Sequence, residues 1–151
     1  MPFAVASGRV GSVVLSDATL IDWRISDKAA DSPTRATTYV TKLMNEYRPT
    51  IVVVEEIGLA RRKGARTCAL ITAISAAAEQ RDVTTIALPR ERRHPNKYAE
   101  AAALVARFPE LAPWQPPQRC FYDSEPRNTV LFEALSLAVQ LLPERLSADE
   151  T

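Results

Sequence analysis

Two glutamates stand at places in the sequence where a carboxylate is unusual. Glu55 ends the apolar run IVVV (51–54), and Glu133 lies inside the apolar stretch TVLFEALSLAV (129–139). Carboxylates are rarely fully buried unless they are paired. A buried strand that ends in a carboxylate delivers that group to the edge of an open α/β sheet, where ligands bind. Either glutamate could hold a metal ion; Glu55 could instead cap a helix or pair with arginine, and Glu133 could occupy a partly exposed helix position.

Basic residues crowd the two segments that follow the predicted strands. ARRKGAR comes shortly after the Glu55 strand, and RERRHPNK comes after the next strand. If these strands are parallel, both segments emerge at one sheet edge, where Arg and Lys can contact phosphates with an affinity that salt weakens. A solvated charged loop is the alternative for each segment. The candidate nucleic-acid-binding residues are Arg61, Arg62, Lys63, Arg66, Arg90, Arg92, Arg93 and Lys97.

The bulk composition narrows the class of protein. The chain has 151 residues, 46% of them hydrophobic, and a formal net charge of +1. This length suits one domain, and the near-neutral charge excludes nucleic-acid binding by overall charge. The two cysteines, Cys68 and Cys120, form no CxxC motif, so neither a zinc site nor a disulfide framework is expected. Without a membrane span or a secretory signal pattern, the sequence predicts a soluble, cytoplasmic protein.

The elements that position these residues follow from apolar patterning and turn signals. Three short apolar runs within residues 2–26 predict an antiparallel meander. Further strands are expected within 50–57 and 83–91, and helices within 31–49, 65–82, 96–111 and 127–142. The order predicts one α/β domain over residues 3–142, with a five-stranded mixed sheet of three antiparallel then two parallel strands and helices on both faces. A polar tail follows at 143–151.

This order of elements resembles the ribonuclease H-like superfamily, and within it the RuvC-type Holliday junction resolvases. The resemblance rests on PTIVVVEEIGLA (49–60), an apolar strand that ends in glutamate, and on LFEALSLAV (131–139), an acidic residue in the last helix. It implies nucleic-acid cleavage by two Mg²⁺ or Mn²⁺ ions that carboxylates hold. Glu55 would match the fourth-strand ligand and Glu133 the last-helix ligand.

The sequence departs from that family's acidic pattern in two places. The family has an aspartate on the first strand, where this chain has Ala6, or Ser7 if the register slips by one. A further acidic residue often lies one turn before Glu133, and here that position is Val130. Glu125 is a weaker substitute, which could reach the same ion only if the chain before Asn128 is not helical.

Three hypotheses follow. The first is a RuvC-like nucleic-acid-processing protein, a magnesium-dependent, structure-selective endonuclease that hydrolyses phosphodiester bonds, with DNA as the expected partner and a homodimer formed through the apolar helix at 67–79. The second is a catalytically degenerate relative that binds nucleic acid without cleaving it, which the missing first-strand aspartate favours. The third is an assembly subunit of a larger complex, with no nucleic acid involved.

Overall fold

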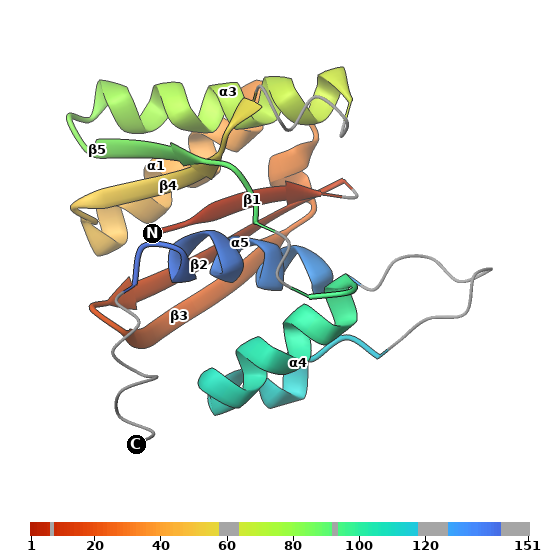
Figure 1. The fold of residues 1–151 in the computed structure, drawn as a ribbon. Helices are drawn as coiled ribbons and strands as arrows, with labels where there is room; N and C mark the ends of the chain where they lie inside the picture. The colour runs from red at the N-terminus through yellow and green to blue at the C-terminus, as the bar shows by residue number, and fades with distance from the viewer. Residues whose placement is uncertain (7, 58–63, 92–93, 118–126, 143–151) are drawn as a thin grey trace.

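The computed structural model describes residues 1–6, 8–57, 64–91, 94–117 and 127–142. Within them the predicted order of strands and helices is confirmed, and Figure 1 shows the elements in place. The strands are β1 (Phe3–Ala6), β2 (Arg9–Ser16), β3 (Thr19–Ser26), β4 (Ile51–Glu55) and β5 (Thr84–Leu88). The helices are η1 (Lys28–Ala30), α1 (Pro33–Tyr47), α3 (Ala65–Gln80), α4 (Lys97–Arg107), η3 (Pro109–Trp114) and α5 (Thr129–Val139).

The strands form two hydrogen-bonded sheets, which corrects the prediction of one continuous mixed sheet. β1, β2 and β3 pair antiparallel in that order, and β4 pairs parallel with β5. Between β1 and β4 the described residues form a single parallel bridge, Pro2 to Val53, beside which the Val53 N–H donates to the Met1 carbonyl at 3.0 Å. Beyond that bridge β4 rises away from β1 (Figure 1), so no ladder continues between the two strands.

The helices begin where the sequence signals predict. The Ser32 side chain accepts a hydrogen bond from the Arg35 N–H at 3.1 Å, and Pro33 occupies the first turn of α1. At α4, Asn96 accepts from the Tyr98 and Ala99 N–H groups. These caps satisfy N–H groups that have no partner inside the helix, so they fix where each helix starts.

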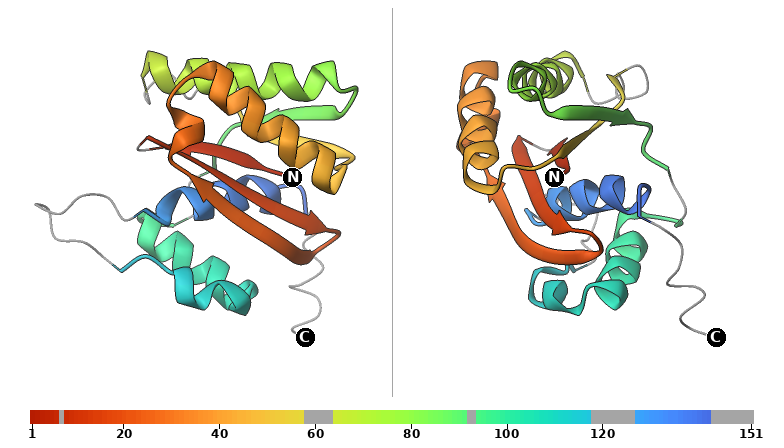
Figure 2. Two further views of the ribbon diagram at one scale, coloured as in Figure 1. Left: turned by 180° about the vertical axis from the view of Figure 1, so that it is seen from behind. Right: turned by 90° about the vertical axis from the view of Figure 1, so that its left-hand side faces the viewer.

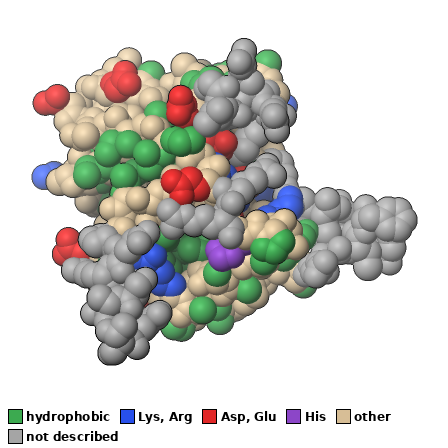
Figure 3. Space-filling model, viewed as in Figure 1, with side chains coloured by type: hydrophobic (Ala, Val, Ile, Leu, Met, Phe, Trp, Pro, Cys, Tyr) green, Lys and Arg blue, Asp and Glu red, His purple; other side chains and the backbone are tan. Residues whose placement is uncertain are grey.

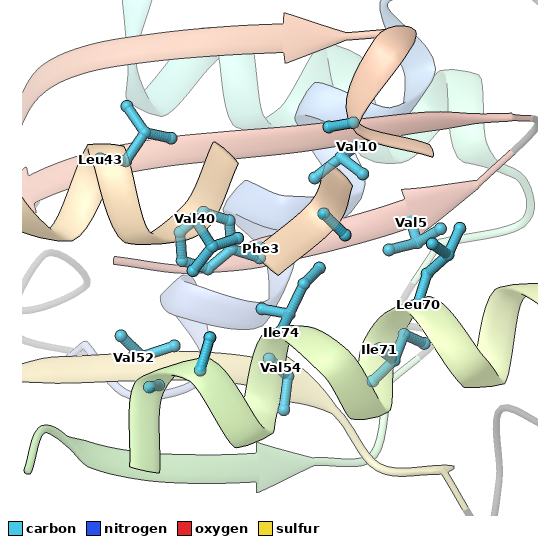
Figure 4. Close-up of a cluster of buried hydrophobic side chains, with 14 of the residues drawn as sticks. Phe3, Val5, Val10, Val40, Leu43, Val52, Val54, Leu70, Ile71 and Ile74 are labelled. Atoms are coloured by element: carbon cyan, nitrogen blue, oxygen red, sulfur yellow. The ribbon is translucent and has the colours of Figure 1, made fainter. Parts of the chain in front are cut away.

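Two apolar clusters lie on opposite sides of the strands. One packs β1, β2 and β4 against α1 and α3, and Figure 4 shows its side chains, Phe3 and Ile74 among them. The other packs the remaining faces of β1, β2 and β3 against α4, η3 and α5. Figure 2 shows α1 and α3 on one side of the strands, with α4 and α5 on the other. Helices on both faces are thus confirmed, and α5 lies next to the sheet.

Gly11 allows α5 to lie directly on β2. A Cβ at this position would stand 2.8 Å from the Val130 carbonyl oxygen and 3.2 Å from the Leu131 nitrogen. Both neighbours are backbone atoms of a buried helix, which cannot move aside without shifting its other contacts. The missing side chain therefore sets the depth of α5, and with it the place of Glu133.

We expect Gly11→Ala to lower the free energy of unfolding by about 1–3 kcal/mol, the usual cost of overpacking a core. Urea unfolding measures the change. Ser16→Ala is the matched control, because Ser16 lies on the same strand and is exposed. Equal stability of Gly11→Ala and the wild type would show that α5 does not depend on this close approach.

Candidate acidic site with an internal arginine

Glu55 lies at the C-terminal end of β4, as predicted. The strand is buried from Val52 onward, and Glu55 itself is 8% exposed. The parallel register pairs Glu55 with Leu88, and the Glu56 N–H donates to the Leu88 carbonyl at 2.8 Å. Because the strands are parallel, the chain leaves β4 and β5 at the same edge of the sheet, beside Glu55 and Leu88. Glu56 is exposed, since successive side chains on a strand point to opposite faces.

Glu133 lies in the most buried helix of the described chain. Every residue from Thr129 to Ala138 is buried, and Glu133 is 6% exposed. Helix α5 contacts β1, β2 and β4. A carboxylate in such surroundings needs a partner. The interpretation of Glu133 as a partly exposed helix position is therefore wrong.

Arg90 supplies that partner from the segment after β5. Its guanidinium lies 2.5 Å from Glu100 Oε1, on α4, and 3.7 Å from Glu133 Oε1, on α5. The side chains of Arg90, Glu100 and Glu133 are 17%, 11% and 8% exposed. We call these three residues the Arg90 triad. It ties the chain after β5 to both helices on that face, with a partly buried positive charge between two buried carboxylates.

The described residues do not supply the donor set of a two-metal centre. Ala6 ends β1, where the resemblance expects an aspartate, and Val130 is packed in the core. No group of three or more His, Cys, Asp or Glu side chains within the described ranges is placed to hold a metal ion. In addition, the Arg90 guanidinium stands beside Glu133, and its charge repels a cation. Ser7 and Glu125 lie outside the described residues.

Asp22 belongs to a different cluster, between β3 and α1. Its carboxylate accepts hydrogen bonds from the Tyr47 hydroxyl and from Arg24 Nε, and Arg24 also reaches Glu46 at 2.8 Å. Burial acts to raise the pKa of Asp22, but the hydrogen bonds from Tyr47, the Trp23 backbone and Arg24 outweigh it, so the pKa is lowered. The hydrogen bond to Asp22 is the main reason that the pKa of Tyr47 rises to about 12.

The predicted nucleic-acid-binding residues have different surroundings. Arg66 donates to the Ala30 and Asp31 carbonyls at 3.0 and 3.4 Å, so it fastens the start of α3 to the turn before α1. Arg90 turns inward to the triad, and Lys97 is half-buried at the start of α4. The remaining candidates lie outside the described residues: Arg61, Arg62, Lys63, Arg92 and Arg93.

Glu100 and the inward role of Arg90 were not predicted from the sequence motifs. A signal for Glu100 does exist. Glu100, Ala101 and Leu104 share the buried side of α4, at the spacing of one helix face. A carboxylate on that apolar stripe needs a cation, and Arg90 is near in sequence. No comparable signal marks Arg90 among the four basic residues of its segment.

Solved structures of RuvC resemble this fold. The structure of RuvC from Thermus thermophilus matches with a TM-score of 0.59 and 18% sequence identity, over 91% of this chain and 89% of that chain. The structure of T. thermophilus RuvC in complex with a Holliday junction substrate matches with a TM-score of 0.51 and 16% identity, over 93% and 92%. No family model and no curated protein matches the sequence. The chain therefore has a RuvC-like α/β fold.

Proposed function

We propose that this chain is a RuvC-like DNA-binding protein that recognises branched DNA and whose acidic site is neutralised by Arg90. The fold likeness supports a nucleic-acid role, because one of the similar structures is a complex with a Holliday junction. The observation that carries the proposal is the Arg90 triad. It places a partly buried guanidinium next to Glu133, one of the two carboxylates that match the acidic pattern.

The charge balance explains why an arginine can replace a metal here. A buried carboxylate without a counter-charge is strongly destabilising. Two Mg²⁺ ions need several oxygen ligands, and the first-strand position that would share them is Ala6, or Ser7 if the register slips by one; neither is a carboxylate. A guanidinium needs no such ligand set, since it satisfies carboxylates through directed N–H bonds. Arg90 therefore keeps this edge folded without metal, and other residues of the two basic segments remain for the phosphates.

A second candidate is the metal-dependent endonuclease. Glu55 and Glu133 are both less than a tenth exposed, on β4 and α5, which are in contact. In this alternative Glu55 and Glu133, with Glu125 as the weaker third, hold Mg²⁺ or Mn²⁺, which would activate a water for phosphodiester hydrolysis. It requires the Arg90 guanidinium to leave Glu133.

The proposed homodimer uses the exposed side of α3. Leu70, Ile71 and Ile74 face the core, whereas Ala69, Thr72 and Ala76 are exposed. Small side chains let two helices approach closely, so a second α3 can pack there.

No helix in the described part of the chain is long and apolar enough to cross a membrane.

Fluorescence anisotropy with a labelled four-way junction tests the proposed function. We expect the logarithm of the binding constant to fall linearly with the logarithm of the salt concentration, because phosphate contacts release counterions. A linear duplex of the same length and label, bound more weakly, is the control for branch recognition. No binding to either DNA at low salt would refute the proposal and leave the assembly-subunit hypothesis.

A further inference from the structure

A pocket of about 220 Å³ lies between α4 and α5, beside the Arg90 triad. Figure 3 shows the hollow next to the histidine, on the face viewed in Figure 1. Its walls come from the segment after β5, from α4 and from α5. The residues that carry the argument are Glu91, Glu100, Leu104, Arg107, Val139 and Gln140.

The pocket combines apolar walls with hydrogen-bonding groups of both kinds. Leu104 and Val139 supply apolar surface, and the carboxylate of Glu100 supplies acceptors. Arg107 Nε and Gln140 Nε2 are buried donors without a hydrogen-bond partner in the part of the chain that the structure describes. Both atoms are themselves covered, although the two residues line the pocket. Buried polar groups are normally satisfied, so unpaired donors in pocket-lining side chains need an explanation.

We infer that this pocket takes an unpaired nucleobase turned out of the DNA, an inference that rests on the proposed DNA binding. A base has flat apolar faces that suit Leu104 and Val139. Its carbonyl oxygen can accept from Gln140 or Arg107 after a small side-chain movement, and its amino or ring N–H can donate to Glu100. Proteins that bind flipped bases read them in this way.

The size and charge of the pocket favour a base over other ligands. Pockets for drug-sized molecules measure about 300–1,000 Å³. At about 220 Å³, this one suits a single ring system. Its charged lining residues are Glu91, Glu100 and Arg107, so the lining has no excess of positive charge that would favour a phosphate.

Glu100 joins the pocket to the acidic site. The same carboxylate that lines the pocket lies 2.5 Å from Arg90, which in turn faces Glu133. A base that donates to Glu100 therefore shares this carboxylate with Arg90. The pocket is thus the place where an unpaired base would be held next to the proposed DNA-binding edge, which gives branched or bulged DNA an advantage over a fully paired duplex.

The test uses a duplex that carries a single bulged 2-aminopurine and a fully paired duplex of the same length. We expect the protein to bind the bulged duplex about tenfold more tightly, with a rise in 2-aminopurine fluorescence as the base leaves the stack. Ala103→Phe fills the pocket from an exposed position and should abolish both effects. Ala102→Phe is the matched control, since Ala102 is exposed on the same helix but does not line the pocket.

Two outcomes separate this inference from the proposed function. If Ala103→Phe keeps both the preference and the fluorescence rise, the pocket does not take the base, while DNA binding stands. If the wild type binds neither duplex nor a four-way junction, both proposals fail. A competition experiment at constant ionic strength adds inorganic phosphate or free nucleosides. If phosphate abolishes the preference for the bulged duplex and nucleosides do not, the pocket binds an anion and the inference is overturned.

Discussion

Replacing Arg90 with leucine should lower the free energy of unfolding by about 3–5 kcal/mol, the range for breaking a buried ion pair. The substitution leaves Glu100 and Glu133 without their shared guanidinium, and the side chains of both are close to nine-tenths buried. The cost is mainly the loss of this positive charge beside two buried carboxylates, because leucine fills much of the same space. Urea unfolding monitored by circular dichroism measures it.

The control for Arg90 is an arginine in an exposed pair. Arg35 lies 4.0 Å from Asp31, and both side chains are about 60% exposed. Arg35→Leu should change stability by less than about 1 kcal/mol, as is usual for surface ion pairs. Adding Glu100→Gln and Glu133→Gln to Arg90→Leu should recover part of the loss, because the negative charges that Arg90 balanced are then removed. If Arg90→Leu is as stable as wild type, the triad does not hold this edge together.

Neutralising the first basic segment, ARRKGAR (60–66), should weaken DNA binding by about a hundredfold at moderate salt, because phosphate contacts are lost. Each lost contact contributes about 0.9 to the slope of log K against log salt concentration. The variant replaces Arg61, Arg62 and Lys63 with glutamine. Its salt slope should fall by about 3, or roughly 1 for each residue. Anisotropy titrations of the four-way junction at several salt concentrations give both quantities. These residues follow β4, the strand that ends at Glu55, in the sequence.

A control variant loses the same number of positive charges at another part of the surface. It distinguishes a loss of local phosphate contacts from an effect of the lower net charge on DNA binding. Lys42→Gln, Arg48→Gln and Arg81→Gln together remove three exposed positive charges. Arg48 and Arg81 lie near the start of β4, at the other end of the strand from Glu55. This variant should bind nearly as wild type does. Equal losses in the two triple variants would mean that the basic segment is a solvated loop rather than a phosphate contact.

Local patterns predicted much of the fold because each pattern has a local physical cause. The apolar run before Glu55 indicated a buried strand, and Ser32 with Pro33 marked the start of α1. The divergence of β1 from β4 was not predictable, because it depends on how far two strands distant in sequence remain parallel in space. Likewise, nothing near Gly11 in the sequence shows that its partner is the backbone at Val130.

The candidate site was predictable only in part. Glu55 and Glu133 lie where the motifs placed them, while their role as metal ligands stays a prediction. The direction of Arg90 could not be predicted, because RERRHPNK offers four positive side chains and the sequence does not say which one turns inward. Burial decides this, since Glu100 and Glu133 both need a counter-charge and Arg90 is within reach of both.

Incubation of the protein with a labelled four-way junction, in Mg²⁺ and separately in Mn²⁺, tests the central claim most directly. The claim is that Arg90 takes the place of the metal ions, so the account predicts that the junction is bound and remains intact. Glu55→Gln and Glu133→Gln provide the matched variants. Metal-dependent cleavage by the wild type that either variant abolishes would contradict the account and establish the endonuclease instead.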